Sequence, residues 1–242
     1  MSLWIKICAN TSLADAMIAA EAGADAVGFV FAPSPRRVTA EQAAAIVREL
    51  PAKIEKIGVF VDAALDEIVA TIEGAGLTGV QLHSEVTAEE TARLRARFGA
   101  ELRIFGVVRF GAQPELPALR SGDSFDHNAA MEIAAQGLEF AAPFLDPQVD
   151  AVLVDSYSLT TRGGTGNRFD WGLAAVTLFK VTGKNKVAAG GLTPENVAEA
   201  IAVLRPWGVD VVSGVEAAPG RKDAAKVLAF IENARAASAL TG

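Results

Sequence analysis

The feature that most constrains the fold of this 242-residue chain is an eightfold alternation of short apolar runs with helical patterns. Each run is nearly all apolar and rich in β-branched residues, as expected for parallel strands that are covered on both faces. The predicted strands are Trp4–Cys8, Ala26–Phe31, Lys56–Val61, Gly79–Leu82, Leu102–Val108, Ala151–Asp155, Lys186–Ala189 and Val209–Ser213.

Between these runs, apolar residues recur at i, i+3, i+4 and i+7, which indicates helices with one face against a sheet. The pattern covers residues 13–20, 43–50, 65–72, 197–204 and 227–234. Residues that favour helix N-termini precede several of these segments and mark where the helices start. They are Ser12 with Asp15, Thr39 with Gln42, Thr87 with Glu90, and Asp62.

Eight strand and helix units in 242 residues average about 30 residues each, the size of one unit of a (β/α)8 TIM barrel. The prediction is a single barrel domain over residues 1–242. A doubly wound open sheet is the alternative, but no G-x-G-x-x-G follows the first strand. An extended connection after strand five covers residues 109–149 with a helix expected at 128–142, and it is either a surface insertion or a lid or oligomer contact.

Composition excludes several function classes. The net charge is −7 and Lys and Arg are scattered, which disfavours a nucleic-acid surface. Mean hydropathy is +0.29, yet no stretch approaches the roughly 18 apolar residues of a membrane span. The N-terminus lacks a secretory signal, so we expect a cytoplasmic protein. One Cys excludes an internal disulfide and a multi-cysteine zinc site, and the two His, His83 and His127, lie far apart in no ligand spacing, so no structural metal is expected.

The active site of such a barrel lies where the strands end at their carboxyl termini. Two side chains there could do acid–base chemistry. The thiol of Cys8 could act as a nucleophile or a base, since a cation or a helix N-terminus lowers a thiol pKa. Asp155 could stay protonated and act as a general acid where apolar walls raise its pKa. Each also has a plain structural interpretation, a small buried side chain and a helix cap.

The other candidates at this end would bind a substrate. Arginines after strand two suit a carboxylate, which they bind bidentately. Backbone N–H groups of glycine-rich loops suit a phosphate, which many barrels bind after strands seven and eight. A glycine cluster after strand six suits a lid or phosphate-gripping loop. These residues are Arg36 and Arg37, Gln81 and His83 of strand four, Gly163, Gly164 and Gly166, and then Gly190, Gly191, Ser213 and Gly214.

Taken together, these stretches resemble one known family, the phosphoribosylanthranilate isomerases of tryptophan biosynthesis. The matching segments run in collinear order along both halves of the chain and are jointly highly specific. They are Lys6–Cys8, Glu21–Phe31, Ser34–Val38, Gly58–Val61, Val80–His83, Gly163–Gly166, Phe169–Trp171, Ala189–Val197 and Asp210–Glu216.

The resemblance implies an enzyme that rearranges N-(5-phosphoribosyl)anthranilate, a small phosphosugar, into an aminoketose without a cofactor. It implies Cys8 as general base, Asp155 as general acid and Arg37 as the ligand of the anthranilate carboxylate. The Gly191 and Ser213–Gly214 loops match the phosphate site. A monomer or a homodimer is expected, with no nucleic-acid or membrane partner.

The chain departs from the family pattern at a few positions. Ala9 follows the cysteine and Ser84 follows the histidine, where relatives usually have Gly, and strand five lacks a common Lys. Two alternatives remain open. One is the related histidine-pathway sugar isomerase, whose base and acid are both Asp, and Cys8 argues against it. The other is a catalytically silent phosphosugar-binding protein that kept the barrel.

Overall fold

The computed structural model describes residues 2–83, 87–110, 146–156, 171–176, 179 and 184–241. The helix expected over residues 128–142, and most of the extended connection after strand five, lie outside the described residues. The glycine cluster at Gly163, Gly164 and Gly166 also lies outside them.

All eight predicted strands are present, and they close into one parallel barrel in chain order. The last strand pairs with the first, with Lys6 opposite Asp210, so the open-sheet alternative is wrong. Strand ends differ from the prediction by one or two residues, which leaves Cys8 and Ser213 just beyond their strands. The strands are β1 (Trp4–Ile7), β2 (Ala26–Val30), β3 (Glu55–Phe60), β4 (Gly79–Leu82), β5 (Arg103–Phe110), β6 (Ala151–Ser156), β7 (Asn185–Ala188) and β8 (Gly208–Val211).

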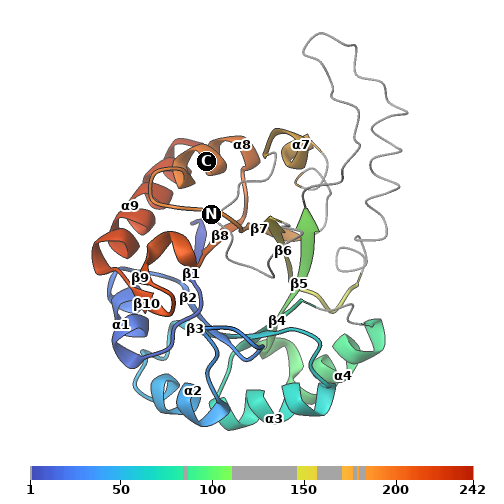
Figure 1. The fold of residues 1–242 in the computed structure, drawn as a ribbon. Helices are drawn as coiled ribbons and strands as arrows, with labels where there is room; N and C mark the ends of the chain where they lie inside the picture. The colour runs from blue at the N-terminus through green and yellow to red at the C-terminus, as the bar shows by residue number, and fades with distance from the viewer. Residues whose placement is uncertain are drawn as a thin grey trace.

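Helices surround the strands, as the view down the barrel shows (Figure 1). No helix in the described ranges is both long and apolar enough to cross a membrane. Short elements after β8 precede the final helix. The helices are α1 (Leu13–Glu21), α2 (Ala40–Val47), α3 (Leu65–Ala75), α4 (Ala88–Phe98), α7 (Trp171–Val176), α8 (Val197–Leu204) and α9 (Ala224–Thr241), with 3-10 turns η1 (Gly99–Glu101) and η3 (Ser213–Val215) and the hairpin strands β9 (Glu216–Ala218) and β10 (Arg221–Lys222).

Three of the four predicted N-caps are confirmed. The side chains of Ser12, Thr39 and Thr87 accept from the backbone N–H three residues on, and the last two form full capping boxes. The prediction for Asp62 is wrong. Its backbone is left-handed, with φ +51°, and α3 begins only after Ala64, so Asp62 belongs to the turn out of β3.

The strands separate two apolar cores. Side chains such as Ile5 and Ile7 point outward and pack against the helices. A smaller cluster fills the barrel interior and includes Trp4, Phe105 and Leu153. Trp4 stacks on Phe105 and on Trp207, each at 5.2 Å between ring centroids. These three rings, named the lower layer below, close the interior at the end where the strands begin.

Candidate active site

Cys8 directly follows β1 at the end of the barrel where the strands have their carboxyl termini. Its backbone N–H donates to the carbonyl of Val211 at 2.9 Å, and its side chain is buried. A Cβ built on Gly28 would lie 2.4 Å from the Cys8 sulfur. Glycine at position 28 is therefore what makes room for the thiol on the barrel side of β2.

The chain turns away after Cys8 through a left-handed residue. Ala9 has φ +60°, a conformation that costs an L-residue roughly 1–2 kcal/mol. Asn10 holds the turn, because its amide donates to the carbonyls of Ile7 at 2.8 Å and Gly28 at 3.2 Å. A glycine would adopt this positive φ without that cost, so the departure expected at Ala9 falls on a left-handed position.

Lys6 lies two residues before Cys8 and also points into the barrel. Its ammonium is 2.6 Å from Oε1 of Gln81 and 3.0 Å from Oδ1 of Asp210, and its Cε lies next to the Cys8 sulfur over Gly28. Burial opposes the charge on Lys6, but Asp210 and Cys8 outweigh burial and raise its pKa. Lys6 is therefore protonated next to the thiol. Lys6, Cys8, Gln81 and Asp210 form what we name the upper layer.

Opposing influences set the pKa of the Cys8 thiol. Burial raises it, because a thiolate is poorly solvated inside the barrel. Lys6 lowers it through its charge and its hydrogen bond, Asp210 raises it and Lys222 lowers it. The net pKa lies above that of an ordinary thiol, and the two lysines are what keep the thiolate accessible.

The upper layer also fixes the state of a histidine. An ammonium only donates, so the amide of Gln81 turns its oxygen to Lys6 and its nitrogen to Nε2 of His83, 2.7 Å away. The amide nitrogen of Gln81 can only donate, so Nε2 of His83 accepts. The network thus assigns His83 as a neutral imidazole with its proton on Nδ1.

The hairpin after β8 holds one of the two predicted arginines. Arg36 binds Glu216 bidentately, at 2.8 Å from Nε and 2.7 Å from Nη2. Glu216 also accepts from the N–H of Gly220 at 3.1 Å and lies 3.5 Å from the ammonium of Lys222. These contacts tie the loop after β2 to the hairpin, across the mouth of the barrel beside Cys8.

Arg37 has a different environment from Arg36. It is exposed, and its backbone N–H donates to the carbonyl of Ser34 at 3.1 Å. Among the described residues it forms no ion pair. The structure thus leaves the guanidinium of Arg37 available to a ligand, while that of Arg36 is bound to Glu216.

Asp155 lies near the end of β6, opposite Arg109 of β5 in the ladder, and is half-buried. Asp155 lies at the same end of the barrel as Cys8. Strands β7 and β8 separate β6, which carries Asp155, from β1, which precedes Cys8. The two side chains therefore approach the mouth from different parts of its rim.

The loops after β7 and β8 pack directly on one another. Gly190 and Gly191 have φ +80° and +64°, and the amide of Asn196 donates to the Gly191 carbonyl at 2.8 Å. A Cβ built on Gly214 would lie 2.0 Å from the carbonyl oxygen of Leu192, so only glycine fits there. The structure thus brings together the two predicted phosphate loops, including Ser213 in η3.

Sequence reasoning missed the buried polar partners of Cys8. Lys6 and Asp210 are single charges inside otherwise apolar strands, and Lys222 and Glu216 lie on the hairpin after β8. A buried charge needs a partner, so a lone charged residue in each of two neighbouring strands was a usable signal.

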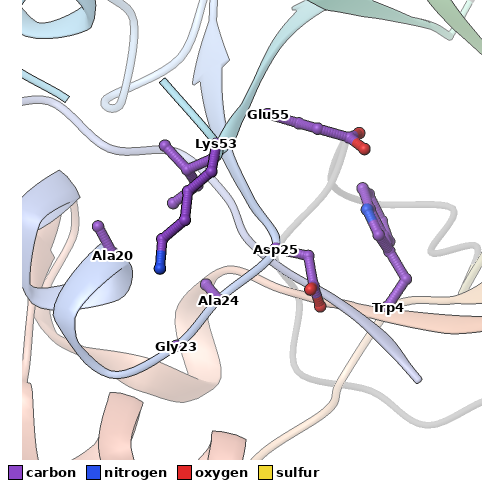
Figure 2. Close-up of a pocket in the computed structure, with 8 residues that line it drawn as sticks. Trp4, Ala20, Gly23, Ala24, Asp25, Lys53 and Glu55 are labelled. Atoms are coloured by element: carbon purple, nitrogen blue, oxygen red, sulfur yellow. The ribbon is translucent and has the colours of Figure 1, made fainter. Parts of the chain in front are cut away.

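The opposite end of the barrel carries a pocket of about 260 Å³, lined by Trp4, Asp25, Lys53 and Glu55 among others (Figure 2). Asp25 there already accepts from the N–H of Ile5 and from Arg235, each at 2.8 Å. None of the predicted site residues lines this pocket. Among the described residues, no group of three or more His, Cys, Asp or Glu is placed to hold a metal ion.

Known proteins match the chain over nearly its whole length. A family model described as N-(5'phosphoribosyl)anthranilate (PRA) isomerase matches residues 5–109 and 121–233. The N-(5'-phosphoribosyl)anthranilate isomerase of Pelobacter propionicus is 41% identical over 233 residues, 96% of this chain and 95% of the relative. That of Geobacter sp. (strain M21) is 40% identical, over 96% and 97% of the two chains.

Solved structures agree with these relatives. The phosphoribosyl anthranilate isomerase of Thermotoga maritima is 35% identical with a TM-score of 0.75, over 97% of this chain and 99% of that one. A phosphoribosyl anthranilate isomerase in complex with reduced 1-(o-carboxyphenylamino)-1-deoxyribulose 5-phosphate is 34% identical with a TM-score of 0.72, over the same shares. The barrel, its strand-end residues and these matches lead to one conclusion: the chain belongs to the N-(5'-phosphoribosyl)anthranilate isomerase family of enzymes.

Proposed function

We propose that this chain converts N-(5-phosphoribosyl)anthranilate into 1-(2-carboxyphenylamino)-1-deoxyribulose 5-phosphate, with Cys8 as general base and Asp155 as general acid. The observation that carries the assignment is a buried thiol beside a protonated lysine, at the barrel end that also has Asp155 and the paired glycine loops. Family membership supports the reaction, and the placement of these side chains supports their roles.

The reaction needs one acid and one base. Asp155 protonates the ribose ring oxygen, and the C1–O bond opens to a protonated Schiff base on the anthranilate nitrogen. Cys8, as the thiolate, removes the proton from C2, and the electron pair forms the C1–C2 double bond of an enolamine. Protonation at C1 and loss of the hydroxyl proton at C2 give the ketone. Hydrogen moves only within the substrate and its acid and base, so the reaction balances without an external oxidant.

The other residues align the substrate for these steps. Arg37 binds the anthranilate carboxylate, since Arg36 is bound to Glu216. Gln81 and His83 complete the substrate side of β4, where the amide of Gln81 acts through its contacts with Lys6 and His83. The phosphate is bound by backbone N–H groups of the glycine loops, at Gly164, Gly190, Gly191, Ser213 and Gly214.

The test is the loss of anthranilate-type fluorescence when purified protein meets freshly made N-(5-phosphoribosyl)anthranilate. We expect a decay whose rate is proportional to protein concentration. A matched preparation of the Cys8→Ala variant controls for a contaminating isomerase and should leave only spontaneous decay. If the unaltered protein gives no decay beyond the spontaneous rate while it still binds inorganic phosphate, the catalytically silent phosphosugar-binding protein replaces this proposal.

A further inference from the structure

The surroundings of Cys8 contain a lysine that takes no part in the steps above. The side chain of Lys6 is 1% exposed, and its ammonium contacts Gln81 at 2.6 Å and Asp210 at 3.0 Å. A Cβ built on Gly28 would lie 2.4 Å from the Cys8 sulfur and 3.0 Å from Cε of Lys6. The two side chains therefore lie side by side over one glycine.

Among the residues that the structure describes, the charges that face Cys8 come from four parts of the fold. They are Lys6 on β1, Asp210 on β8, Lys222 and Glu216 on the hairpin, and Arg36 after β2. Three cations stand against two carboxylates, so the cluster carries one net positive charge while Cys8 is a thiol. Loss of the thiol proton makes it neutral. A buried cluster is most stable when its charges balance, so these charges offset part of the penalty that burial imposes on the thiolate.

The three cations are not equivalent. Arg36 is bound bidentately to Glu216, and Lys222 contacts the carbonyl of Val212 at 3.4 Å and Glu216 at 3.5 Å. Lys6 lies beside the Cys8 sulfur over Gly28, and of the three cations it has the largest influence on the thiol. Its two other contacts, on β4 and β8, aim the ammonium across the barrel and limit its rotation.

We propose that Lys6, held by Asp210 and Gln81, is a positioning residue that stabilises Cys8 as the thiolate. The inference rests on the proposed function only in taking Cys8 as the base. Asp210 has a double effect, since it keeps Lys6 protonated inside the barrel and opposes the thiolate by its own charge. The charge of Lys6 acts on the thiol more strongly than that of Asp210, and the Lys6 side chain lies next to the sulfur over Gly28.

The chain has a single Cys, so its thiolate can be titrated without interference. The measurement is the ultraviolet thiolate absorbance of each variant against pH, with the same protein carrying Cys8→Ala subtracted. In Lys6→Met we expect the midpoint to rise by at least about one pH unit, and kcat at neutral pH to fall about tenfold with little change in KM. Lys56→Met is the matched control, because within the described part of the chain the Lys56 ammonium donates only to the carbonyls of Pro51 and Ala52, just before β3.

Lys6→Met leaves the buried carboxylate of Asp210 without its ion-pair partner, and a second variant controls for this effect. In the double variant Lys6→Met with Asp210→Asn the ion pair is gone and no charge is left unpaired. We expect its midpoint to stay above that of the unaltered protein. A midpoint equal to that of the unaltered protein would mean that the Lys6–Asp210 pair has no net effect on the thiolate, and it would overturn the inference. Superimposable titrations of Lys6→Met and Lys56→Met would overturn it as well.

The outcomes separate this inference from the proposed function. If the unaltered protein does not turn over N-(5-phosphoribosyl)anthranilate but the Lys6 variants shift the titration, the pairing stands and the proposed function fails. If turnover is present and the titrations superimpose, the proposed function stands and the pairing fails.

Discussion

The two ends of the barrel interior are built from opposite kinds of side chain. In the lower layer, Trp4 stacks on Phe105 and Trp207 and contributes no charge. In the upper layer, a buried lysine and a buried aspartate on neighbouring strands flank the thiol. On β1 the change takes only two residues, from Trp4 to Lys6.

This contrast indicates that stability and chemistry depend on different layers. The aromatic layer closes the interior from one side, so the charges above it lie in a poorly polarisable environment. Electrostatic interactions are stronger there than in water, and so is the penalty for an unpaired charge. Changes in the upper layer should therefore act on rate and protonation, and changes in the lower layer on the free energy of unfolding.

The largest expected effect is on turnover. Cys8→Ala and Asp155→Asn should each lower kcat by about 100-fold to 10,000-fold, since each removes one proton-transfer group. Both variants should keep a cooperative thermal unfolding transition close to that of the unaltered protein. The fluorescence assay measures the loss of kcat, and circular dichroism measures the unfolding transition. Retained turnover in either variant would contradict the acid and base assignment.

The lower layer should give the opposite result. Phe105→Ala removes a ring that is 1% exposed and stacked on Trp4, and it should cost about 3–5 kcal/mol in the free energy of unfolding. Its kcat per folded molecule should stay within about twofold, because the ring lies below the charged groups. Urea unfolding measures the stability, with Phe105→Leu as a milder control. A large loss of kcat in folded protein would break the contrast between the layers.

Gly28→Ala should affect both properties at once. The added methyl group would lie 2.4 Å from the Cys8 sulfur, so the thiol has to move, at a cost of about 1–3 kcal/mol. We expect lower stability and lower kcat in the same variant. Gly74→Ala in α3 is the control, since nothing lies within 4 Å of its added Cβ. That variant should gain about 0.5–1 kcal/mol and keep full activity.

The pH dependence of the rate follows from the raised pKa of Cys8. Burial holds the thiol protonated beyond its ordinary range, so the thiolate fraction falls tenfold for each pH unit below that pKa. As long as the general acid keeps its proton, kcat/KM should therefore rise with pH through neutrality. The folded state also holds this proton more tightly than the unfolded chain does. The free energy of unfolding that this contributes is present below the thiol pKa of the unfolded chain and is lost as the pH rises through the higher pKa of the folded state. A rate that falls across this range would contradict the Cys8 assignment.

The smallest expected effect is at Ala9. A glycine there would relieve roughly 1–2 kcal/mol of left-handed strain, offset by about 0.4–1 kcal/mol of added freedom in the unfolded chain. Ala9→Gly should therefore raise the free energy of unfolding by up to about 1 kcal/mol. Thermal unfolding measures the change, and a clear loss of stability would mean that the buried Ala9 methyl matters more than the backbone.

The eight strands could be predicted from sequence because their runs are long enough to bury both faces, and only their ends shifted. The Asp62 error has a local cause. An Asp before an apolar stripe reads as an N-cap, but the sequence does not reveal that the backbone at Asp62 turns left-handed before α3.

The positions of the candidate residues could be predicted, while their roles stay predictions. Cys8 and Asp155 lie at strand ends, and Arg36 and Arg37 follow β2, as the strand pattern indicated. Their separation into one bound and one available arginine depends on Glu216, which lies 180 residues from Arg36. Pairings at such distances follow from the closure of the barrel and not from local pattern.

The parallel pairing of β1 with β8 also has a consequence for the order of folding. The groups around the thiol come from the first and last strands, and Asp15 and Lys222, which join α1 to β10, are 207 residues apart. A chain emerging from the ribosome cannot bring these groups together until almost all of it has been synthesised. The reactivity of the single thiol should therefore change when the last strand docks on the first, which would make it a reporter of ring closure.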